Sequence, residues 1–205
     1  MSLRTVVKEI YSWVRTIFWV FLFSFLITVF AFEPYYVSGG SMEPTLGGTE
    51  YSATGEGGDR VIVFKSPYLW GVKPNFGDIV VIDSRVARKR TLLDELKENS
   101  LIRSIWGEDH TYIWIKRVIG EPGDILECKD GQLYRNGALL TEEYLQELSD
   151  YCGFESITVP YDHIFVMGDN RRYSQDSRQI GTIPVDHVKG RLILRYFPFD
   201  RVSLY

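Results

Sequence analysis

An uncharged, strongly apolar segment lies close to the start of this 205-residue chain, at residues 16–32. As an α-helix it would be about 26 Å long, close to the thickness of a bilayer's hydrocarbon core. Only Thr16, Ser24 and Thr28 interrupt the segment, so it lacks the polar face of a helix packed on a soluble core. A cleaved signal peptide would be followed by small residues, but bulky ones follow here at 31–34. We therefore predict one uncleaved transmembrane anchor, with the lipid bilayer as a partner.

Flanking charges predict the direction of this anchor. Arg4, Lys8 and Arg15 precede the apolar segment, whereas the next basic residue after it is Arg60. Basic flanks favour the cytoplasmic side of a membrane. We therefore predict a single-pass protein of the plasma membrane in three parts. These are a cytoplasmic N-terminus at 1–15, a transmembrane helix at 16–32 and an extracytoplasmic domain at 33–205.

Beyond the anchor, the sequence shows the pattern of short β-strands separated by turns. The expected strands are rich in β-branched and aromatic residues and lie at 60–64, 79–82, 112–119, 125–128, 133–135, 163–167 and 191–197. Asp130-Gly131 and Asn136-Gly137 are typical hairpin turns. The predicted fold class is therefore mainly β, a sandwich or a barrel-like domain behind an N-terminal transmembrane helix.

Residues 84–106 depart from this strand pattern. Four basic residues at 85–90 are followed by apolar residues at helical spacing, which predicts a short helical insert. Two interpretations remain open. The insert can be a helix packed on the domain, or a basic amphipathic element that contacts lipid headgroups.

Composition argues against several classes of function. A net charge of −4 provides no basic field for nucleic acid. The three histidines are scattered and the two cysteines lack the spacing of metal ligands, so we predict no metal and no cofactor. Cys128 and Cys152 can form a disulfide if the domain is extracytoplasmic, or remain two free thiols.

A serine and a lysine are the candidates for catalysis. Ser41 lies in a glycine-containing segment, which alone is typical of an ordinary loop. A serine that attacks a peptide bond needs a base, and the histidines form no triad pattern. Lys116 lies in an apolar strand at 113–119, where burial would lower its pKa from about 10.4. Lys116 and Arg117 face opposite sides of this strand, so one can be buried while the other stays exposed. An exposed edge strand is the alternative.

Four segments resemble, in this order, the signature segments of bacterial type I signal peptidases of peptidase family S26. They are residues 39–46, 77–81, 116–124 and 168–178. The resemblance extends from Val37 to about Arg195 and is closest to the single-span Gram-positive form. It implies a β-rich signal-peptidase-like domain and a membrane-anchored serine endopeptidase. Such an enzyme removes N-terminal signal peptides from secreted preproteins and would act next to the secretion translocon.

The resemblance also implies roles for individual residues. Ser41 would be the nucleophile, with its backbone N–H in the oxyanion hole, and Lys116 would be the general base. Ser174 would orient the lysine. Residues that shape the catalytic site or the substrate region would be Gly39, Met42, Asp169, Asp176 and Arg178. The substrate would bind as an extended strand, with small residues at the first and third positions before the cleaved bond.

Two departures from the family pattern matter. Gly39 stands where many relatives have a serine that completes the oxyanion hole, so we expect a water or a second backbone N–H there. Arg172-Tyr173 replace the Asp-Asn or Asn-Asn that relatives often have.

Three alternative functions compete with this prediction. A specialised maturation peptidase of the same family fits the four segments equally well. An inactive membrane-anchored binding relative is disfavoured by the intact Ser41 and Lys116. A self-cleaving Ser–Lys repressor would need a helix-turn-helix in place of the anchor, and the sequence shows none.

Overall fold

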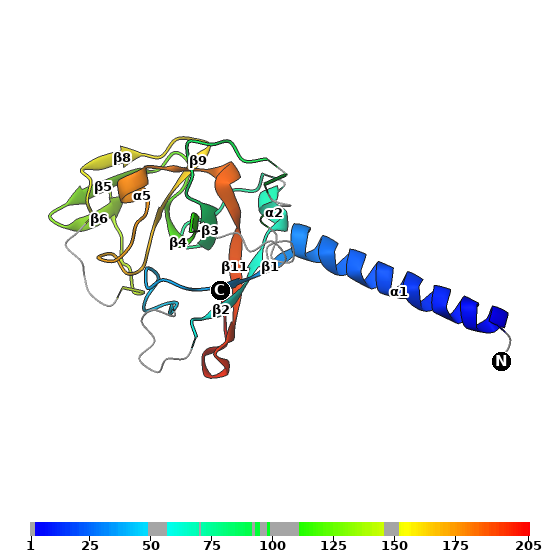
Figure 1. Ribbon diagram of the computed structural model, residues 1–205. Coiled ribbons are helices and arrows are strands. Elements are labelled where there is room, and N and C mark those ends of the chain that lie inside the picture. The colour runs from blue at the N-terminus through cyan, green and yellow to red at the C-terminus, as the bar shows by residue number, and fades with distance from the viewer. Residues whose placement is uncertain are drawn as a thin grey trace.

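A long N-terminal helix projects from a β-rich domain in the computed structural model (Figure 1). The structure describes residues 3–48, 57–69, 71–91, 93–94, 98, 111–145 and 152–205. Helix α1 spans Leu3–Phe30, and nearly all of its described side chains are exposed. Over Arg4–Phe30 it is long and apolar enough to cross a membrane.

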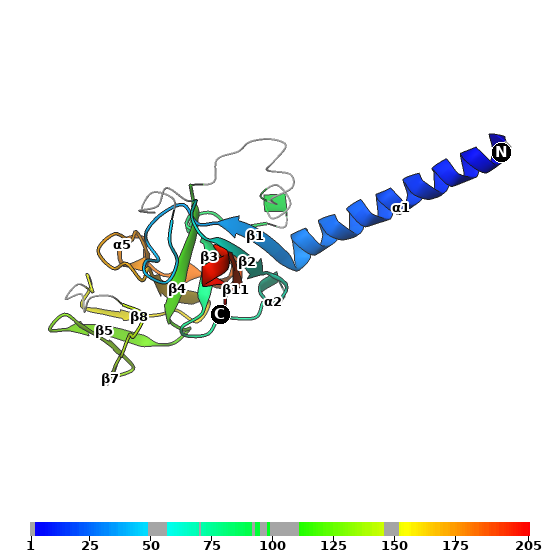
Figure 2. The same ribbon diagram turned by 90° about the horizontal axis from the view of Figure 1, so that it is seen from below.

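The helix ends two residues before the end of the predicted span and passes directly into the sheet. Its last turn closes with a hydrogen bond from the Ala31 N–H to the Ile27 carbonyl (2.8 Å). Phe32 begins strand β1, Phe32–Tyr36, where it pairs with Phe64 and stacks on its ring at 5.1 Å. Phe32 therefore leaves the helix because it pairs with Phe64 of the neighbouring strand. Figure 2 shows β1 continuing from the end of α1.

Two antiparallel sheets form the domain. The larger has the strand order β1-β2-β11-β3-β4-β9-β10, with β12 paired to β11. Its further strands are β2 Arg60–Phe64, β3 Ile79–Asp83, β4 Ile113–Gly120, β9 His163–Met167, β10 Ile183–Pro184, β11 Val188–Phe197 and β12 Ser203–Leu204. The smaller has the order β7-β6-β5-β8, with β5 Ile125–Lys129, β6 Gln132–Arg135, β7 Ala138–Leu139 and β8 Ser156–Thr158. The predicted mainly β class is confirmed.

Short helices occupy a few of the connections. They are α2 Ser66–Leu69, α5 Ser177–Ile180, η2 Val185–His187 and η3 Phe199–Arg201. Every predicted strand has an observed counterpart, and both predicted turns are present. Asp130-Gly131 and Asn136-Gly137 have positive φ angles at both positions, which tight hairpin turns require. Strands β1, β7, β8, β10 and β12 have two to five residues, too few for a clear alternating pattern.

The base of the predicted helical insert is held by ion pairs. Within 84–106 the structure describes only residues 84–91, 93–94 and 98, so the rest of the predicted helix lies outside the described residues. Arg85 and Arg90 both donate to the Glu98 carboxylate, at 2.7 and 2.9 Å, and Arg88 pairs with Asp94. Carboxylates of the same segment thus pair with these cations, and Glu98 also accepts from Lys189 of β11 at 2.7 Å. The role of the insert stays a prediction.

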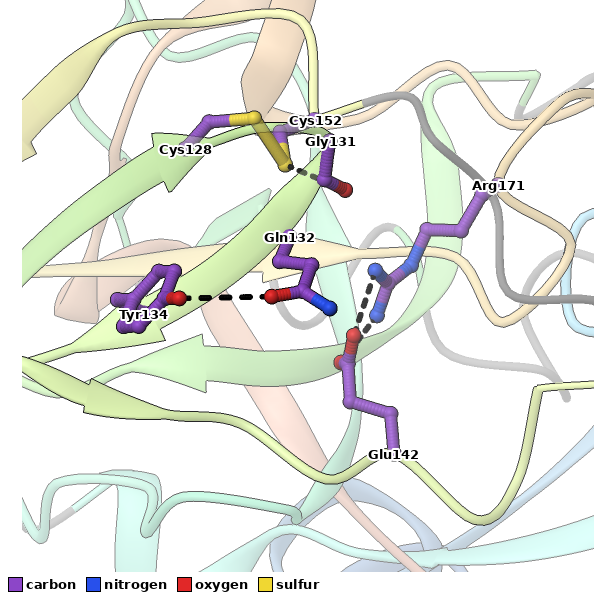
Figure 3. Close-up of a disulfide and its surroundings, with 7 residues drawn as sticks. All are labelled: Cys128, Gly131, Gln132, Tyr134, Glu142, Cys152 and Arg171. Atoms are coloured by element: carbon purple, nitrogen blue, oxygen red, sulfur yellow. Dashed lines mark hydrogen bonds and ion pairs between the residues drawn. A yellow bond between two sulfur atoms is a disulfide. The ribbon is translucent and has the colours of Figure 1, made fainter.

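The two cysteines form a disulfide in the smaller sheet. Cys128 of β5 is bonded to Cys152, with a Cα–Cα separation of 5.8 Å, which lies within the normal range (Figure 3). The disulfide therefore ties β5 to the chain just before β8 and resolves the alternative that the sequence leaves open.

A buried ion pair lies where α1 meets the larger sheet. Lys65 Nζ donates to Glu33 Oε2 at 2.9 Å, and the two side chains are only 0% and 1% exposed. The Tyr35 hydroxyl donates to the same carboxylate oxygen at 3.0 Å. The Lys65 N–H also donates to the Ala31 carbonyl (2.8 Å). The junction between helix and sheet is therefore fixed by both backbone and side-chain bonds.

We expect Glu33→Gln to destabilise the domain, because it removes the carboxylate charge that the buried Lys65 ammonium contacts at 2.9 Å. Breaking such a pair lowers the free energy of unfolding by about 3–5 kcal/mol. The double variant Glu33→Leu/Lys65→Met removes both charges and should recover most of the loss. Thermal unfolding in detergent, followed by circular dichroism, measures both changes. An unchanged midpoint for Glu33→Gln would contradict the prediction.

Candidate active site

Ser41 and Lys116 lie in direct contact in the folded domain. Lys116 Nζ is 2.7 Å from Ser41 Oγ, within hydrogen-bond distance. A charged ammonium donates to the hydroxyl oxygen, whereas a neutral amine can accept the hydroxyl proton. The arrangement therefore places a potential base on a potential nucleophile.

The segment that carries Ser41 is anchored in the core. Met42 and Leu46 are fully buried in a cluster that also contains Val61, Ile79 and Leu192. The structure thus places Met42 beneath the segment and away from the cavity surface. Its predicted contact with substrate stays a prediction.

Asp169 and Asn170 hold the Ser41 segment through hydrogen bonds. The Asn170 N–H donates to the Ser41 carbonyl at 3.0 Å, and Asn170 Nδ2 donates to the Gly40 carbonyl at 3.1 Å. The Thr45 hydroxyl donates to Asp169 Oδ2 at 2.5 Å. Asn170 is a site residue that the sequence prediction did not include, although it lies within the fourth signature segment.

Lys116 is held in the middle of the larger sheet. It pairs with Val80 across β3 and β4, and only 3% of the residue is exposed. Burial lowers the pKa of Lys116 to about 8, since desolvation penalises the ammonium. The Asp176 and Asp169 carboxylates act in the opposite direction, while the Arg178 charge lowers the pKa further. Burial prevails, so a useful fraction of the amine is neutral near physiological pH.

Arg117, the next residue, is also largely covered. The sequence allows one member of this pair to be buried while the other stays exposed, but the Arg117 side chain is only 12% exposed. Its guanidinium donates to both Asp169 oxygens, at 2.9 and 2.7 Å, and lies 3.9 Å from the centre of the Tyr144 ring. Arg117 can be covered because the Asp169 carboxylate satisfies the charge of its guanidinium.

The predicted charged pair Asp176–Arg178 forms in the structure. Two Arg178 nitrogens donate to the two Asp176 oxygens, both at 2.8 Å. Burial raises the pKa of Asp176, but the hydrogen bonds and charge of Arg178 outweigh it and the net pKa is lowered. Asp176 also caps helix α5 and accepts from the Gly168 N–H at 3.1 Å. This pair therefore fixes the loop between β9 and α5.

Ser174 lies beside the nucleophile segment. A Cβ at Gly168 would be 2.3 Å from Ser174 Oγ and 2.4 Å from the Ser41 carbonyl oxygen, so only glycine permits this approach. The Ser174 hydroxyl donates to the Gln175 carbonyl at 3.4 Å. Orientation of Lys116 by Ser174 stays a prediction.

A cavity of about 680 Å³ opens beside the two reactive groups. One wall is formed by residues 35–39, which end β1 and lead to Ser41, and another by residues 113–116 of β4. Tyr173 and Gln175 of the fourth segment also line it. A Cβ at Gly39 would meet no atom within 4 Å, so this wall leaves open space near Ser41. The cavity suits an extended peptide lying between two strands.

The segment that follows β7 reinforces the fourth signature segment. Arg171 donates to both oxygens of Glu142 (Figure 3). The bond from Nη1 is 2.9 Å long. Its Nε donates to the Gly168 carbonyl at 3.2 Å. The Arg171–Glu142 pair joins positions 29 apart in the sequence, and the only signal for Arg171 is its place in the fourth segment. The chain after β7 thereby supports the loop that holds Ser41.

The described residues contain no group of three or more His, Cys, Asp and Glu side chains positioned to hold a metal ion.

We expect Lys116→Met to stabilise the domain at pH 7. The lysine pKa falls from 10.5 to about 8 on folding, which corresponds to about 3 kcal/mol. The folded domain therefore becomes less stable as the pH drops from 10.5 through 8, and methionine at position 116 removes this loss of stability. The gain in unfolding free energy should shrink as the pH is raised toward 10.5. Urea unfolding measures it, with exposed Lys129→Met as the control. A destabilised Lys116→Met variant at pH 7 would contradict the prediction.

Comparisons with known proteins extend over almost the whole chain. Residues 10–197 match the family Signal peptidase, peptidase S26. Signal peptidase I of Bacillus licheniformis is 34% identical over 205 residues, which cover 95% of this chain and 92% of that protein. Signal peptidase I T of Bacillus subtilis is 33% identical, covering 93% and 87%. A crystal structure of a signal peptidase I from Enterococcus faecalis is 29% identical, covering 58% of this chain and 97% of that chain, with a TM-score of 0.39.

Proposed function

The chain belongs to the signal peptidase family, peptidase S26, and on this premise we propose that Ser41 and Lys116 are its catalytic dyad. Its function is that of a signal peptidase I, a serine endopeptidase that removes signal peptides from preproteins. One observation carries the assignment of the dyad. The 2.7 Å contact joins a serine hydroxyl to a buried lysine whose pKa is lowered to about 8.

In the proposed first step, neutral Lys116 takes the proton of Ser41 Oγ as the oxygen attacks the scissile carbonyl. The negative charge that develops on the carbonyl oxygen is stabilised by the Ser41 backbone N–H and a second donor. Lys116 then gives its proton to the leaving amine, and the peptide bond breaks to leave an acyl group on Ser41. In the second step, Lys116 removes a proton from water, which attacks the acyl group and releases the carboxylic acid. The proton passes back to Ser41.

The second oxyanion donor is a water or another backbone N–H. Gly39 carries no hydroxyl, and a Cβ there would meet no atom within 4 Å. This open space supports a bound water beside the carbonyl oxygen. Asp169, Asp176 and Arg178 act on the reaction through the pKa of Lys116 and the position of the loop.

The active site lies near the membrane surface. Only 11 positions separate the end of α1 at Phe30 from Ser41, at most about 40 Å when extended. A preprotein held in the bilayer by its own apolar segment can reach the cavity in this position. We propose small side chains at the first and third positions before the cleaved bond, and a location next to the secretion translocon.

The proposed orientation places the N-terminus in the cytoplasm and the catalytic domain outside it. The basic residues Arg4, Lys8 and Arg15 before the apolar segment support this direction. The Cys128–Cys152 disulfide is a second argument, because disulfides persist in oxidising compartments and are rare in the cytosol.

Cleavage of a preprotein in detergent tests the dyad. We expect the unmodified protein to cut after a small-x-small sequence, and Ser41→Ala and Lys116→Ala each to lose at least about 10³-fold in kcat/KM. Lys129→Ala, which removes an exposed lysine, is the matched control and should keep its activity. Full activity of Lys116→Ala would rule out the dyad.

The pH dependence tests the role of the lysine separately. Because the neutral amine is the reactive form, kcat/KM should rise about tenfold per pH unit below pH 8 and level off above it. The Asp176 carboxylate raises the pKa of Lys116, so Asp176→Asn should move the rising limb to lower pH. Initial rates on a peptide substrate from pH 6 to 10 measure both the rise and the plateau. A rise centred near pH 10.5 would show that burial does not activate Lys116.

A further inference from the structure

Tyr173 places an exposed aromatic ring at the mouth of the catalytic cavity. The residue is 72% exposed, yet it lines the same cavity as Ser41 and Lys116. A large aromatic side chain left in water at this position has area available for a ligand.

The backbone holds this ring in a defined place relative to the nucleophile. The Tyr173 N–H donates to the Asn170 carbonyl at 3.1 Å, and Asn170 itself bonds to Ser41 and Gly40. On the other side, Ser174 is buried against Gly168. The loop is thus rigidly connected to the site, while the ring itself is left uncovered.

The geometry of an extended peptide determines which substrate side chain meets this ring. Successive side chains of a strand point to opposite faces. If the first and third residues before the cleaved bond point to the cavity floor, the second points to its mouth. Tyr173 stands at that mouth, with Gln175 beside it in the lining.

We propose that Tyr173 is a specificity-determining residue that contacts the second residue before the cleaved bond and favours an apolar or aromatic side chain there. This inference rests on the proposed function, because it assumes that an extended signal peptide is cleaved at Ser41. The contact is between the face of the tyrosine ring and the apolar surface of the substrate side chain. Because the Tyr173 ring is largely exposed to water, we expect the contact to change kcat/KM only moderately.

Peptides that differ only at the second position test this contact. Each peptide has alanine at the first and third positions and phenylalanine, leucine or glycine between them. We expect the unmodified protein to prefer phenylalanine over glycine by about three- to tenfold in kcat/KM. Tyr173→Asn should reduce this ratio to about one, and Tyr173→Phe should retain it because the ring is kept. Tyr161→Asn is the matched control, since Tyr161 is 80% exposed but does not line the cavity.

The outcomes separate this inference from the function on which it rests. An unchanged phenylalanine-to-glycine ratio in Tyr173→Asn, with Ser41→Ala inactive, would overturn the contact and leave the dyad intact. A ratio near one in the unmodified protein would overturn it as well. Cleavage by Ser41→Ala at the rate of the unmodified protein would instead overturn the proposed function, and this inference with it.

Discussion

The burial of one amine is the constraint on which the site depends. Lys116 lies in the middle of a sheet, where an ammonium is poorly solvated, and its pKa falls to about 8. The neutral amine is favoured only as long as the surrounding strands exclude water. Nearby carboxylates work against that effect, but Arg117 and Arg178 engage Asp169 and Asp176. The ion pairs around the site therefore limit how strongly the carboxylates reverse the effect of burial.

Asp169 and Asn170 bring separate parts of the chain together at Ser41. Asp169 accepts from Thr45 of the first segment and from Arg117 of the third, while Asn170 holds the backbone around Ser41. Each of these bonds joins positions distant in sequence but close in the fold. The third and fourth segments meet because β4 and β9 are neighbours in the larger sheet.

Local patterns in the sequence predict local structure well in this chain. Alternation and β-branched residues predict the longer strands, and Asp130-Gly131 predicts its hairpin because positive φ angles need such residues. The apolar neighbours of Lys116 predict its burial. The Lys65–Glu33 and Arg171–Glu142 pairs could not be predicted, because nothing local links their partners. Coverage of Arg117 also depends on a partner 52 positions away.

The direct passage from helix to sheet has a mechanical consequence. No flexible linker separates α1 from β1, and the Lys65–Glu33 pair locks the corner between them. The catalytic domain must therefore follow the tilt of its own membrane helix. Because helix tilt responds to bilayer thickness, the height of Ser41 above the lipid would vary with the membrane in which the protein resides. The helix and the domain together would thus set the distance between the bilayer and the peptide bond that reaches Ser41.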